Sequence, residues 1–306
     1  MARYLATRIG LGVLTVFGVV LLTFVLMFVV PGDPARTIAG PRATPQILAL
    51  VRANLHLNQS VLAQLGHYLA GIVHGDLGVS YVQDQPVAQL IIDRLPATIE
   101  LGLAGLALEL ILGGAFGVWD GIRPRRSRIL AVVNVGLLSV PAFSLAFVLL
   151  LLFGYKLSLF PIDGGTGGTR IVLPALTLGL FGMPYYANVV RDAMQETLAA
   201  PYTRTAVAKG LPRRAVLRRH VLRNAFSPAL TMAGLDFAIL LSGVVFVETV
   251  FGWPGIGQLQ TQAFYNVDRP VLMGTVVVAA VLVVVATLAI DLIRMAIDPR
   301  TRLETQ

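Results

Sequence analysis

A strongly basic polar segment, residues 191–228, lies between two long apolar runs. It holds eight basic residues against two acidic ones, Asp192 and Glu196. The basic residues are Arg191, Arg204, Lys209, Arg213, Arg214, Arg218, Arg219 and Arg223. Charge of this kind suits a surface that binds a partner, but it also suits a loop whose charge only fixes the topology of a membrane protein.

The same segment has the proline and glycine spacing of short helices. Pro201 suits a first helical turn, and Gly210 suits the left-handed residue that ends a helix. Pro212 then favours a restart of helix, and Pro228 favours the next break. These positions predict an ordered helical loop rather than an unstructured one, which favours presentation of the loop to a partner.

Small side chains in this loop add to that prediction. A helix with a small face can seat closely in a groove of another protein, and charge-driven topology does not require such a face. The small residues are Ala199, Ala200, Ala206, Ala208 and Gly210.

Two carboxylic acids lie inside the apolar runs, where ionisable groups are costly and often functional. Glu109 lies near the middle of its run, and Asp236 lies about a third of the way into another. Three interpretations stay open for each acid. The carboxyl group could line a polar translocation path, relay protons, or form a hydrogen bond to a neighbouring helix, such as one bearing Asn134.

Glycines and prolines within the runs predict how the helices pack. Gly113 and Gly117 form a pair of small residues one turn apart, which favours close helix packing. Pro141 and Pro184 predict kinks in their helices, and a kink can frame a cavity or a hinge.

Several other chemistries lack the residues that they need. The sequence has no cysteine, no G-x-x-x-x-G-K-[ST] phosphate-binding loop and no visible catalytic triad or carboxylate pair. His67 and His74 lie near Asp76, but two histidines without a close third ligand indicate surface residues rather than a metal site. The net charge of +8 follows from basic loops of a membrane protein and does not predict nucleic-acid binding.

The composition predicts an all-α protein that crosses a membrane several times. Of 306 residues, 56% are hydrophobic and 13% are charged, against about 25% charged in soluble domains. A span needs roughly 20 mostly apolar residues. Six runs qualify, at about 9–30, 97–119, 129–153, 171–190, 229–250 and 271–293.

Basic residues orient these spans. With a cytoplasmic N-terminus, the inside segments hold 17 of the 24 Lys and Arg residues, and the short loop 121–128 alone holds four. Positive residues favour the cytoplasmic side, so both termini are predicted to lie on the cytoplasmic side of a plasma (inner) membrane.

Residues 31–96 form the one long segment predicted on the external side. They are too many for a bare loop and are predicted to fold. Thr44-Pro45 indicates a helix start, and an amphipathic helix follows from about residue 62 to a turn at Gly75–Gly78. A second short helix is predicted at about 86–94, ending near Pro96. The predicted organisation is a tail and first span (1–30), an external segment (31–96), a five-helix core (97–294) with the loop 191–228, and a cytoplasmic tail (295–306).

The loop and several other strings together resemble one family. The sequence from Tyr202 to Leu211, with Pro228 after 16 further residues, is similar to the cytoplasmic "EAA" coupling loop of ABC importer permeases, in particular of the dipeptide/oligopeptide/nickel group. The order and spacing of the other strings extend the resemblance along nearly the whole chain. They are Pro31–Pro34, His74–Gly78, Pro86-Val87, Arg94–Thr98, Ser139–Phe143, Val247–Gly257 and Asp298–Arg300.

The chain departs from the general importer pattern at one point. The Glu that begins the named motif is absent, and Arg204 or Thr205 stands in its place, which is common in the peptide group. The resemblance implies a type I importer permease fold with residues that dock a cytoplasmic ATPase. These residues are Tyr202, Arg204, Thr205, Ala206, Ala208, Lys209, Gly210 and Leu211.

The resemblance also implies partners and a mechanism. Two ABC ATPase subunits would bind ATP-Mg and move the loop, a second homologous permease would complete the pore, and an extracytoplasmic binding protein would deliver the cargo, most simply dipeptides or oligopeptides. The chain itself would be no enzyme and would hold no cofactor or metal. Glu109, Pro141 and Asp236 would border the pathway.

Two other functions remain open at this point. An ion-coupled secondary transporter would use Glu109 and Asp236, but it should show inverted repeats, which are not evident in the sequence. A membrane scaffold would recruit a partner through the loop and transport nothing.

Overall fold

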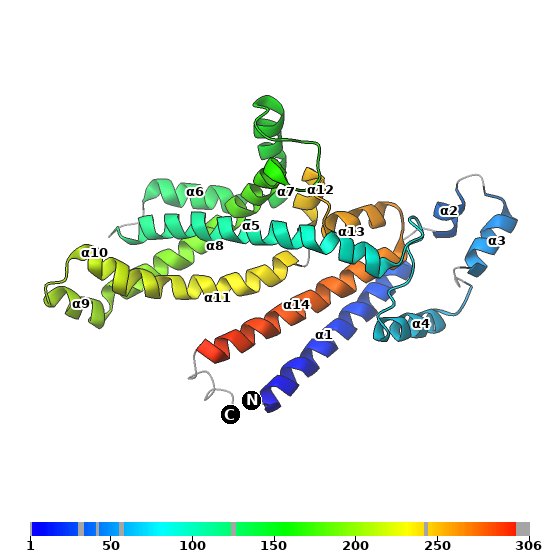
Figure 1. Cartoon of the computed structure of the whole chain (residues 1–306), viewed down its shortest axis with the longest axis horizontal. Coiled ribbons are helices and arrows are strands. Elements are labelled where there is room, and N and C mark those ends of the chain that lie inside the picture. Colours follow the sequence, from blue (N-terminus) through cyan, green and yellow to red (C-terminus); the bar gives the residue numbers. More distant parts are fainter. Residues whose placement is uncertain are drawn as a thin grey trace. The chain divides into compact units, whose positions relative to one another are not determined.

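The computed structural model describes residues 2–29, 34–40, 43–54, 58–123, 127–241 and 244–297, and these are mostly helical (Figure 1). Within these ranges the backbone forms one isolated β-bridge, between Val79 and Pro86, and no strand. The α-helices are α1 (Ala2–Val29), α2 (Pro34–Ala39), α3 (Pro45–Asn54), α4 (Val61–Val73), α5 (Val87–Gly121), α6 (Arg128–Ser139), α7 (Ala142–Leu149), α8 (Val172–Ala199), α9 (Pro201–Ala208), α10 (Arg213–Val216), α11 (Leu222–Leu241), α12 (Val245–Phe251), α13 (Ile256–Tyr265) and α14 (Arg269–Ile297). Two π-helical turns, Leu150–Lys156 and Leu217–Val221, and a 3₁₀ turn, Gly168–Ile171, join them.

The chain divides into two compact units. The first unit comprises Met1–Thr98, Leu241–Val245 and Pro254–Gln306, and the second comprises Ile99–Leu240 and Phe246–Trp253. The long helix α5 contributes its first part to one unit and its remainder to the other.

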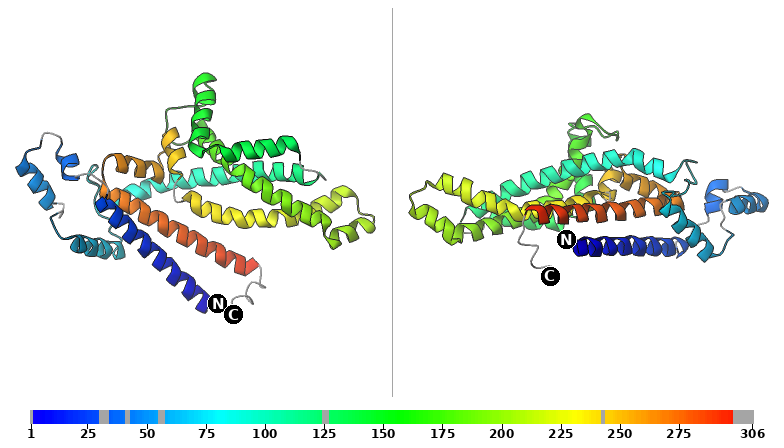
Figure 2. Two further views of the ribbon diagram at one scale, coloured as in Figure 1. Left: turned by 180° about the vertical axis from the view of Figure 1, so that it is seen from behind. Right: turned by 60° about the horizontal axis from the view of Figure 1, so that its bottom comes forward.

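In the first unit, α1 and α14 lie side by side in every view (Figure 2). An Arg8–Asp291 ion pair, with 3.3 Å between Nη1 and Oδ2, joins the two helices. Gly12 of α1 lies so close to Val284 of α14 that an added Cβ would be 2.6 Å from its Cγ1. A small residue is therefore needed where the two helices touch.

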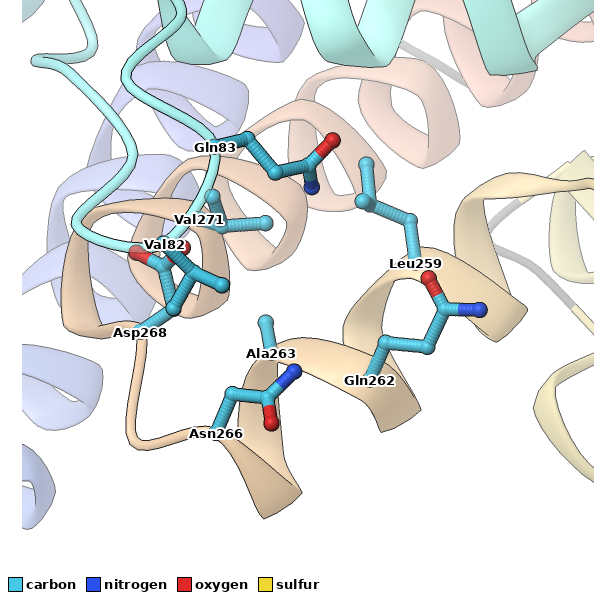
Figure 3. A pocket seen from close by; sticks show the side chains of 8 residues that line it. All are labelled: Val82, Gln83, Leu259, Gln262, Ala263, Asn266, Asp268 and Val271. Carbon is cyan, nitrogen blue, oxygen red and sulfur yellow. The ribbon is translucent and has the colours of Figure 1, made fainter. Parts of the chain in front are cut away.

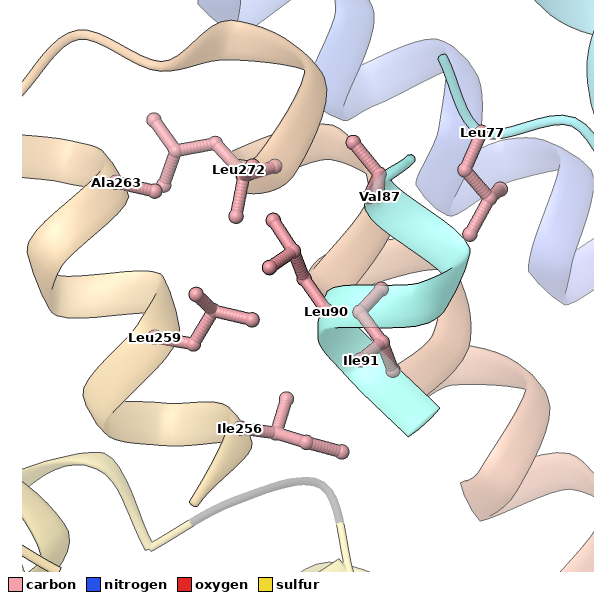
Figure 4. Close-up of a cluster of buried hydrophobic side chains, with 9 residues drawn as sticks. Leu77, Val87, Leu90, Ile91, Ile256, Leu259, Ala263 and Leu272 are labelled. Atoms are coloured by element: carbon pink, nitrogen blue, oxygen red, sulfur yellow. The ribbon is translucent and has the colours of Figure 1, made fainter. Parts of the chain in front are cut away.

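The core of the first unit gathers the start of α5, α13 and the start of α14 (Figure 4). Val87, Leu90 and Ile91 of α5 pack against Ile256 and Leu259 of α13. All five side chains are buried, and burying such a side chain contributes roughly 1.5–3 kcal/mol. Helix α13 was not among the predicted elements, because ten residues between two longer apolar runs give a weak periodic signal.

A tight loop ahead of α5 is fixed to the same core. Buried Asp268 accepts hydrogen bonds from the Ser80 hydroxyl and from the Tyr81 backbone N–H. At the start of α13, the Ile256 N–H donates to Thr98 Oγ1 at 2.9 Å. These bonds join segments more than 150 residues apart in sequence.

In the second unit, glycines bring α5 and α8 into close contact. A Cβ at Gly113 would collide with Tyr186 and lie 2.8 Å from the Met183 carbonyl oxygen, and one at Gly117 would lie 2.7 Å from the Ala187 carbonyl oxygen. The predicted packing role of this glycine pair is confirmed. Tyr186, Val190 and Met194 of α8 also belong to a buried cluster that includes residues of α9, α10 and α11.

The segment predicted to be external, residues 31–96, has the predicted helix ends where the structure describes them. Helix α3 begins at Pro45, where Thr44 Oγ1 accepts from the Ile47 N–H at 3.4 Å. Helix α4 ends at Val73, and Gly75 follows with a φ of 78°. The separate short helix predicted at 86–94 is wrong: α5 runs through Pro96 without a break. A proline does not have to end a helix that crosses a membrane. Neighbouring helices, side chains and small changes of the backbone can satisfy the carbonyl group that the proline leaves without a hydrogen bond.

Among the residues that the structure describes, four helices are long and apolar enough to cross a membrane, and a bent pair raises the number to five. The four apolar segments are Ala6–Met27, Val87–Gly121, Arg213–Leu241 and Arg269–Leu292. The predicted run 171–190 lies in α8, where Pro184, two tyrosines and an asparagine dilute the apolar character. The structure therefore supports a polytopic all-α protein with four to five apolar spans.

The prolines in the other predicted spans behave differently from one another. The helix containing the 129–153 run is broken rather than kinked at Pro141: α6 ends at Ser139, α7 begins at Ala142, and the two bend by 101°. Residue Val140 is extended, as the residue before a proline prefers. In contrast, α8 stays helical through Pro184 and α11 through Pro228, so the predicted break at Pro228 is wrong.

Candidate functional site

The predicted helix of the basic loop is present as α9, at the tip where α8 ends and α10 begins (Figure 1). Ala200 is extended, with a φ of −65° and a ψ of 146°, and Pro201 is the first helical residue. Gly210 is left-handed, with a φ of 78°. The Gly210 N–H donates to the Val207 carbonyl at 2.9 Å and the Leu211 N–H to the Ala206 carbonyl at 3.3 Å, so the glycine cap is confirmed.

The inner face of α9 is fixed to the rest of the second unit. Thr203 and Ala206 are buried, and Thr203 Oγ1 donates to the Thr197 carbonyl of α8 at 2.7 Å. Ala206 belongs to the buried cluster that contains Met194 and Val216. The predicted small face is therefore divided, because Ala206 points inward while Ala208 and Gly210 are exposed.

The outer face of α9 combines apolar and basic side chains. Tyr202, Val207 and Leu211 are 48%, 59% and 37% exposed. Arg204, Thr205, Ala208 and Lys209 are exposed as well. Large apolar groups in water carry a free-energy cost that contact with another protein removes, so this face has the composition of an interface. Val207 was missed from the sequence, although a valine on a short helix between Arg204 and Lys209 was a usable signal.

Four arginines line an open groove of about 680 Å³ on α10 and the start of α11. The π-helical turn Leu217–Val221 lies within this segment. The groove gathers positive charge on the segment that follows α9. The arginines are Arg214, Arg218, Arg219 and Arg223.

One arginine of the loop is committed to an ion pair inside the protein. Arg191 Nε lies 2.9 Å from Asp120 Oδ2 at the end of α5, and both side chains are largely buried. Asp120 Oδ1 also accepts from the Ser127 N–H at 2.9 Å, just before α6. The pair thus connects α5, α8 and the chain entering α6, and supports the base of the loop. Asp120 was not singled out from the sequence, since an acid at the end of a span reads as an ordinary surface residue.

The two acids within the apolar runs meet in the second unit. Glu109 is 4% exposed, and its carboxyl group interacts with that of Asp236. Tyr186 of α8 donates its hydroxyl to Asp236 Oδ2 at 2.8 Å. Gly182 provides the space, because a Cβ there would collide with the Glu109 carboxyl group. The three helices α5, α8 and α11 are thereby joined by one polar cluster.

The structure shows which side chain joins the cluster of the two acids, a question that the sequence left open. Asn134 does not reach this cluster in the described structure; its Nδ2 donates to Asn188 Oδ1 at 3.2 Å. Tyr186 takes that place instead. Pro141 is exposed at the break between α6 and α7.

In the first unit, a small pocket of about 190 Å³ opens between the loop ahead of α5, α13 and the start of α14 (Figure 3). Its floor is the buried trio Leu259, Ala263 and Val271, and the amides of Gln83 and Gln262 lie at its rim. Nearby exposed aromatic residues, Phe264 and Tyr265, pack edge to face on the same helix end. Aromatic side chains are enriched in protein interfaces.

Comparisons with known proteins agree over the whole length of the chain. The profile of "Binding-protein-dependent transport system inner membrane component" matches residues 110–303, and "Binding-prot-dependent transport system membrane comp, N-term" matches residues 1–102. The chain is 36% identical over 305 residues to the glutathione transport system permease protein GsiC of Escherichia coli O6:H1, covering 99% of each chain. It is also 36% identical over 312 residues to a putative peptide transport system permease protein of Brucella abortus (strain 2308), again with 99% of each covered.

Solved structures show the same fold at lower identity. An inward-facing MetNI methionine ABC transporter matches with a TM-score of 0.56 and 20% identity, covering 69% of this chain and 97% of that one. An amino acid ABC transporter crystallised with histidines matches with a TM-score of 0.52 and 14% identity, covering 67% and 92%.

Proposed function

The chain belongs to the family of binding-protein-dependent transport system inner membrane components and is a permease subunit of an ABC importer. We propose that it imports short peptides and that a cytoplasmic ATPase drives it through α9. The relatives are transport components rather than catalytic ones, so ATP hydrolysis belongs to a separate subunit. The same relatives remove the support for an ion-coupled secondary transporter.

The cargo proposal rests on the names of the relatives. A glutathione permease and a putative peptide permease each match 99% of this chain. Glutathione is itself a short peptide, so a dipeptide-to-oligopeptide cargo is common to both. Uptake of labelled dipeptides and tripeptides by cells with and without the chain tests this; uptake of neither would refute the cargo class while leaving the ATPase proposal standing.

The coupling proposal rests on the outer face of α9. Tyr202, Val207 and Leu211 place apolar surface in water, while Arg204 and Lys209 surround it with positive charge. Thr205, Ala208 and Gly210 complete the docking surface in this proposal. Ala206 supports it from below, because its side chain faces the buried cluster rather than a partner.

Buried contacts between α9 and the helices beneath it make α9 suitable for transmitting force. Thr203 bonds to the end of α8, and the Arg191–Asp120 pair joins α8 to α5. A push on α9 would therefore reach α5 and α8 without first being lost in a flexible hinge. In the second unit, Asp236 and Pro141 are proposed to border the pathway, and Glu109 braces the helices behind them.

The topology and the partners extend the same proposal. We infer six crossings with both termini inside, by counting the less apolar α8 as a span and placing 17 of the 24 Lys and Arg in the cytoplasm. The five-helix core 97–294, with its loop 191–228, follows the external segment 31–96. A second homologous permease and two ATPases complete the complex. A binding protein docks at the external end, where Phe264 and Tyr265 are exposed.

A charge placed on α9 tests the coupling proposal. Val207→Asp introduces a desolvated carboxylate into the proposed interface, whereas Val79→Asp places the same charge on a similarly exposed valine, 52% against 59%, in the first unit. Each variant is co-expressed with the ATPase subunits and purified through a tag on the permease. We expect Val207→Asp to lose the ATPase and Val79→Asp to retain it. Equal retention by both variants would refute docking through α9.

A further inference from the structure

A second, larger pocket lies in the first unit, where α1, α4 and the start of α14 meet. Its volume is about 480 Å³, within the range of roughly 300–1,000 Å³ typical of sites for small ligands. Phe24 and Met27 of α1, Leu77 and Met273 give it an apolar wall. Polar and charged side chains of the external segment and of α14 supply the rest of the lining.

This pocket lies where the first and last apolar segments end. Met27 is the last residue of the apolar segment Ala6–Met27, and Arg269 is the first of Arg269–Leu292. Helix α4, which forms another wall, exposes Leu62 and Val73. A short amphipathic helix with exposed apolar residues beside the ends of two spans suits the membrane–water boundary. A ligand in the pocket is therefore in reach of lipid.

One wall of the pocket carries a buried hydroxyl without a partner. The Tyr68 ring stacks on Phe24 with 6.4 Å between the ring centroids. Its hydroxyl oxygen is buried and has no hydrogen-bond partner among the described residues. Burial raises the pKa of Tyr68, so the phenol stays protonated and can donate. A buried donor without an acceptor is unfavourable, and a ligand oxygen in the pocket would remove that cost.

The pocket also contains charges of both signs. Arg269 and Asp76 both line it. Asp76 Oδ1 accepts from the Gly78 N–H at 2.8 Å, which leaves Oδ2 as an acceptor for a ligand. Gln59 and Gln64 add amide groups. A purely anionic ligand would meet the Asp76 carboxylate, and a purely cationic one would meet Arg269, so the lining suits a ligand that carries both charges.

We propose that this pocket binds the phosphoethanolamine headgroup of a membrane phospholipid. Arg269 and the Tyr68 hydroxyl donate to the phosphate or ester oxygens, and the primary ammonium group donates to Asp76 and the glutamine carbonyl oxygens. The first carbons of the acyl chains lie on Phe24, Met27 and Met273. A choline headgroup fits less well, because its quaternary nitrogen has no N–H to donate. The proposal rests on the membrane setting of the family and not on the cargo or on coupling through α9.

Lipid binding to the full-length chain tests the proposal. The chain is purified in detergent, stripped of lipid and titrated separately with phosphatidylethanolamine, phosphatidylcholine and phosphatidylglycerol, with bound lipid read by native mass spectrometry and by the rise in Tm. We expect phosphatidylethanolamine to bind about tenfold more tightly than either of the others, as expected for about one charge-assisted hydrogen bond. Equal binding of phosphatidylcholine would overturn the assignment of the headgroup.

Single-atom changes locate the site. Tyr68→Phe removes the hydroxyl and keeps the ring, and we expect about fivefold weaker binding of phosphatidylethanolamine. Tyr265→Phe makes the same change on an exposed tyrosine outside the pocket and should leave the binding of phosphatidylethanolamine unchanged. Asp76→Asn keeps an oxygen for the Gly78 N–H and should abolish the preference for ethanolamine over choline. Unchanged binding by Tyr68→Phe, in a variant whose lipid-free Tm equals that of the wild type, would refute the site. Displacement of the lipid by a soluble dipeptide would show instead that the pocket is a peptide site.

Discussion

The left-handed residue at the end of α9 allows a test in which only backbone conformation changes. Gly210 has a φ of 78°, and an added Cβ would meet no atom within 4 Å. A larger side chain therefore causes no clash with neighbours. Its cost comes from the backbone: about 1–2 kcal/mol for an ordinary L-residue in this conformation, and more for a β-branched one. Gly210→Val should thus favour opening of the cap.

Opening the cap breaks two hydrogen bonds and frees the end of the helix. The bonds are those of the Gly210 and Leu211 N–H groups to the Val207 and Ala206 carbonyls. If the capped form is the one that docks, a penalty of about 1–2 kcal/mol lowers the ratio of capped to open form by a factor of about 5–30. Gly210→Asn is the matched control, because asparagine tolerates the left-handed region far better than valine does.

The assay is ATP hydrolysis by the co-purified complex, titrated with ATPase subunit. We expect Gly210→Val to weaken association with the ATPase by up to about 5–30-fold, Gly210→Asn to stay within about threefold of the wild type, and both to reach the membrane in normal amounts. Full association and hydrolysis with Gly210→Val would show that the cap does not hold the docking form. A defect as large in Gly210→Asn as in Gly210→Val would show that the loss does not come from backbone handedness.

Three further predictions concern the helices that support α9. Asp120→Ala leaves Arg191 without its largely buried partner and should lower the free energy of unfolding by about 3–5 kcal/mol, measured as a lower Tm. The added change Arg191→Met should restore part of the lost stability. No recovery would argue against the ion pair as the cause. Gly113→Ala forces α5 and α8 apart and should destabilise by about 1–3 kcal/mol, while Gly136→Ala, with no atom within 4 Å of the new Cβ, should be neutral or stabilising; equal Tm values would contradict the close contact. Tyr186→Phe removes the donor to the Asp236 carboxyl group and should cost about 1–3 kcal/mol, and an unchanged Tm would show that the polar cluster does not brace the helices.

The ends of α9 were predictable because they depend on local chemistry. A proline at the first turn and a glycine in the left-handed region act through their own backbones, so Pro201 and Gly210 indicated the helix without knowledge of the fold. The same holds for the glycine contact of α5, since small residues one turn apart indicate close packing whichever helix is the partner.

Features that depend on tertiary context were not predictable in this way. Pro96 and Pro228 lie inside helices while Pro141 lies at a break, so the residue type alone does not indicate which proline ends a helix. The Arg191–Asp120 pair joins positions 71 residues apart, and nothing in the local sequence of either residue indicates the other. The inward direction of Ala206 likewise follows from the docking of α9 on α8 and α10 rather than from its residue type.

The most direct test of the account is a site-specific cross-link between α9 and the ATPase. The sequence has no cysteine, so Val207→Cys introduces a unique thiol on the outer face of α9, and Val79→Cys introduces one in the first unit as the control. Each variant is co-expressed in cells with the ATPase and treated with a short bifunctional reagent. The account predicts a cross-link to the ATPase from position 207 alone, with a yield that changes between the nucleotide-free and ATP-bound states. A cross-link absent at position 207, or equally strong from position 79, would contradict it.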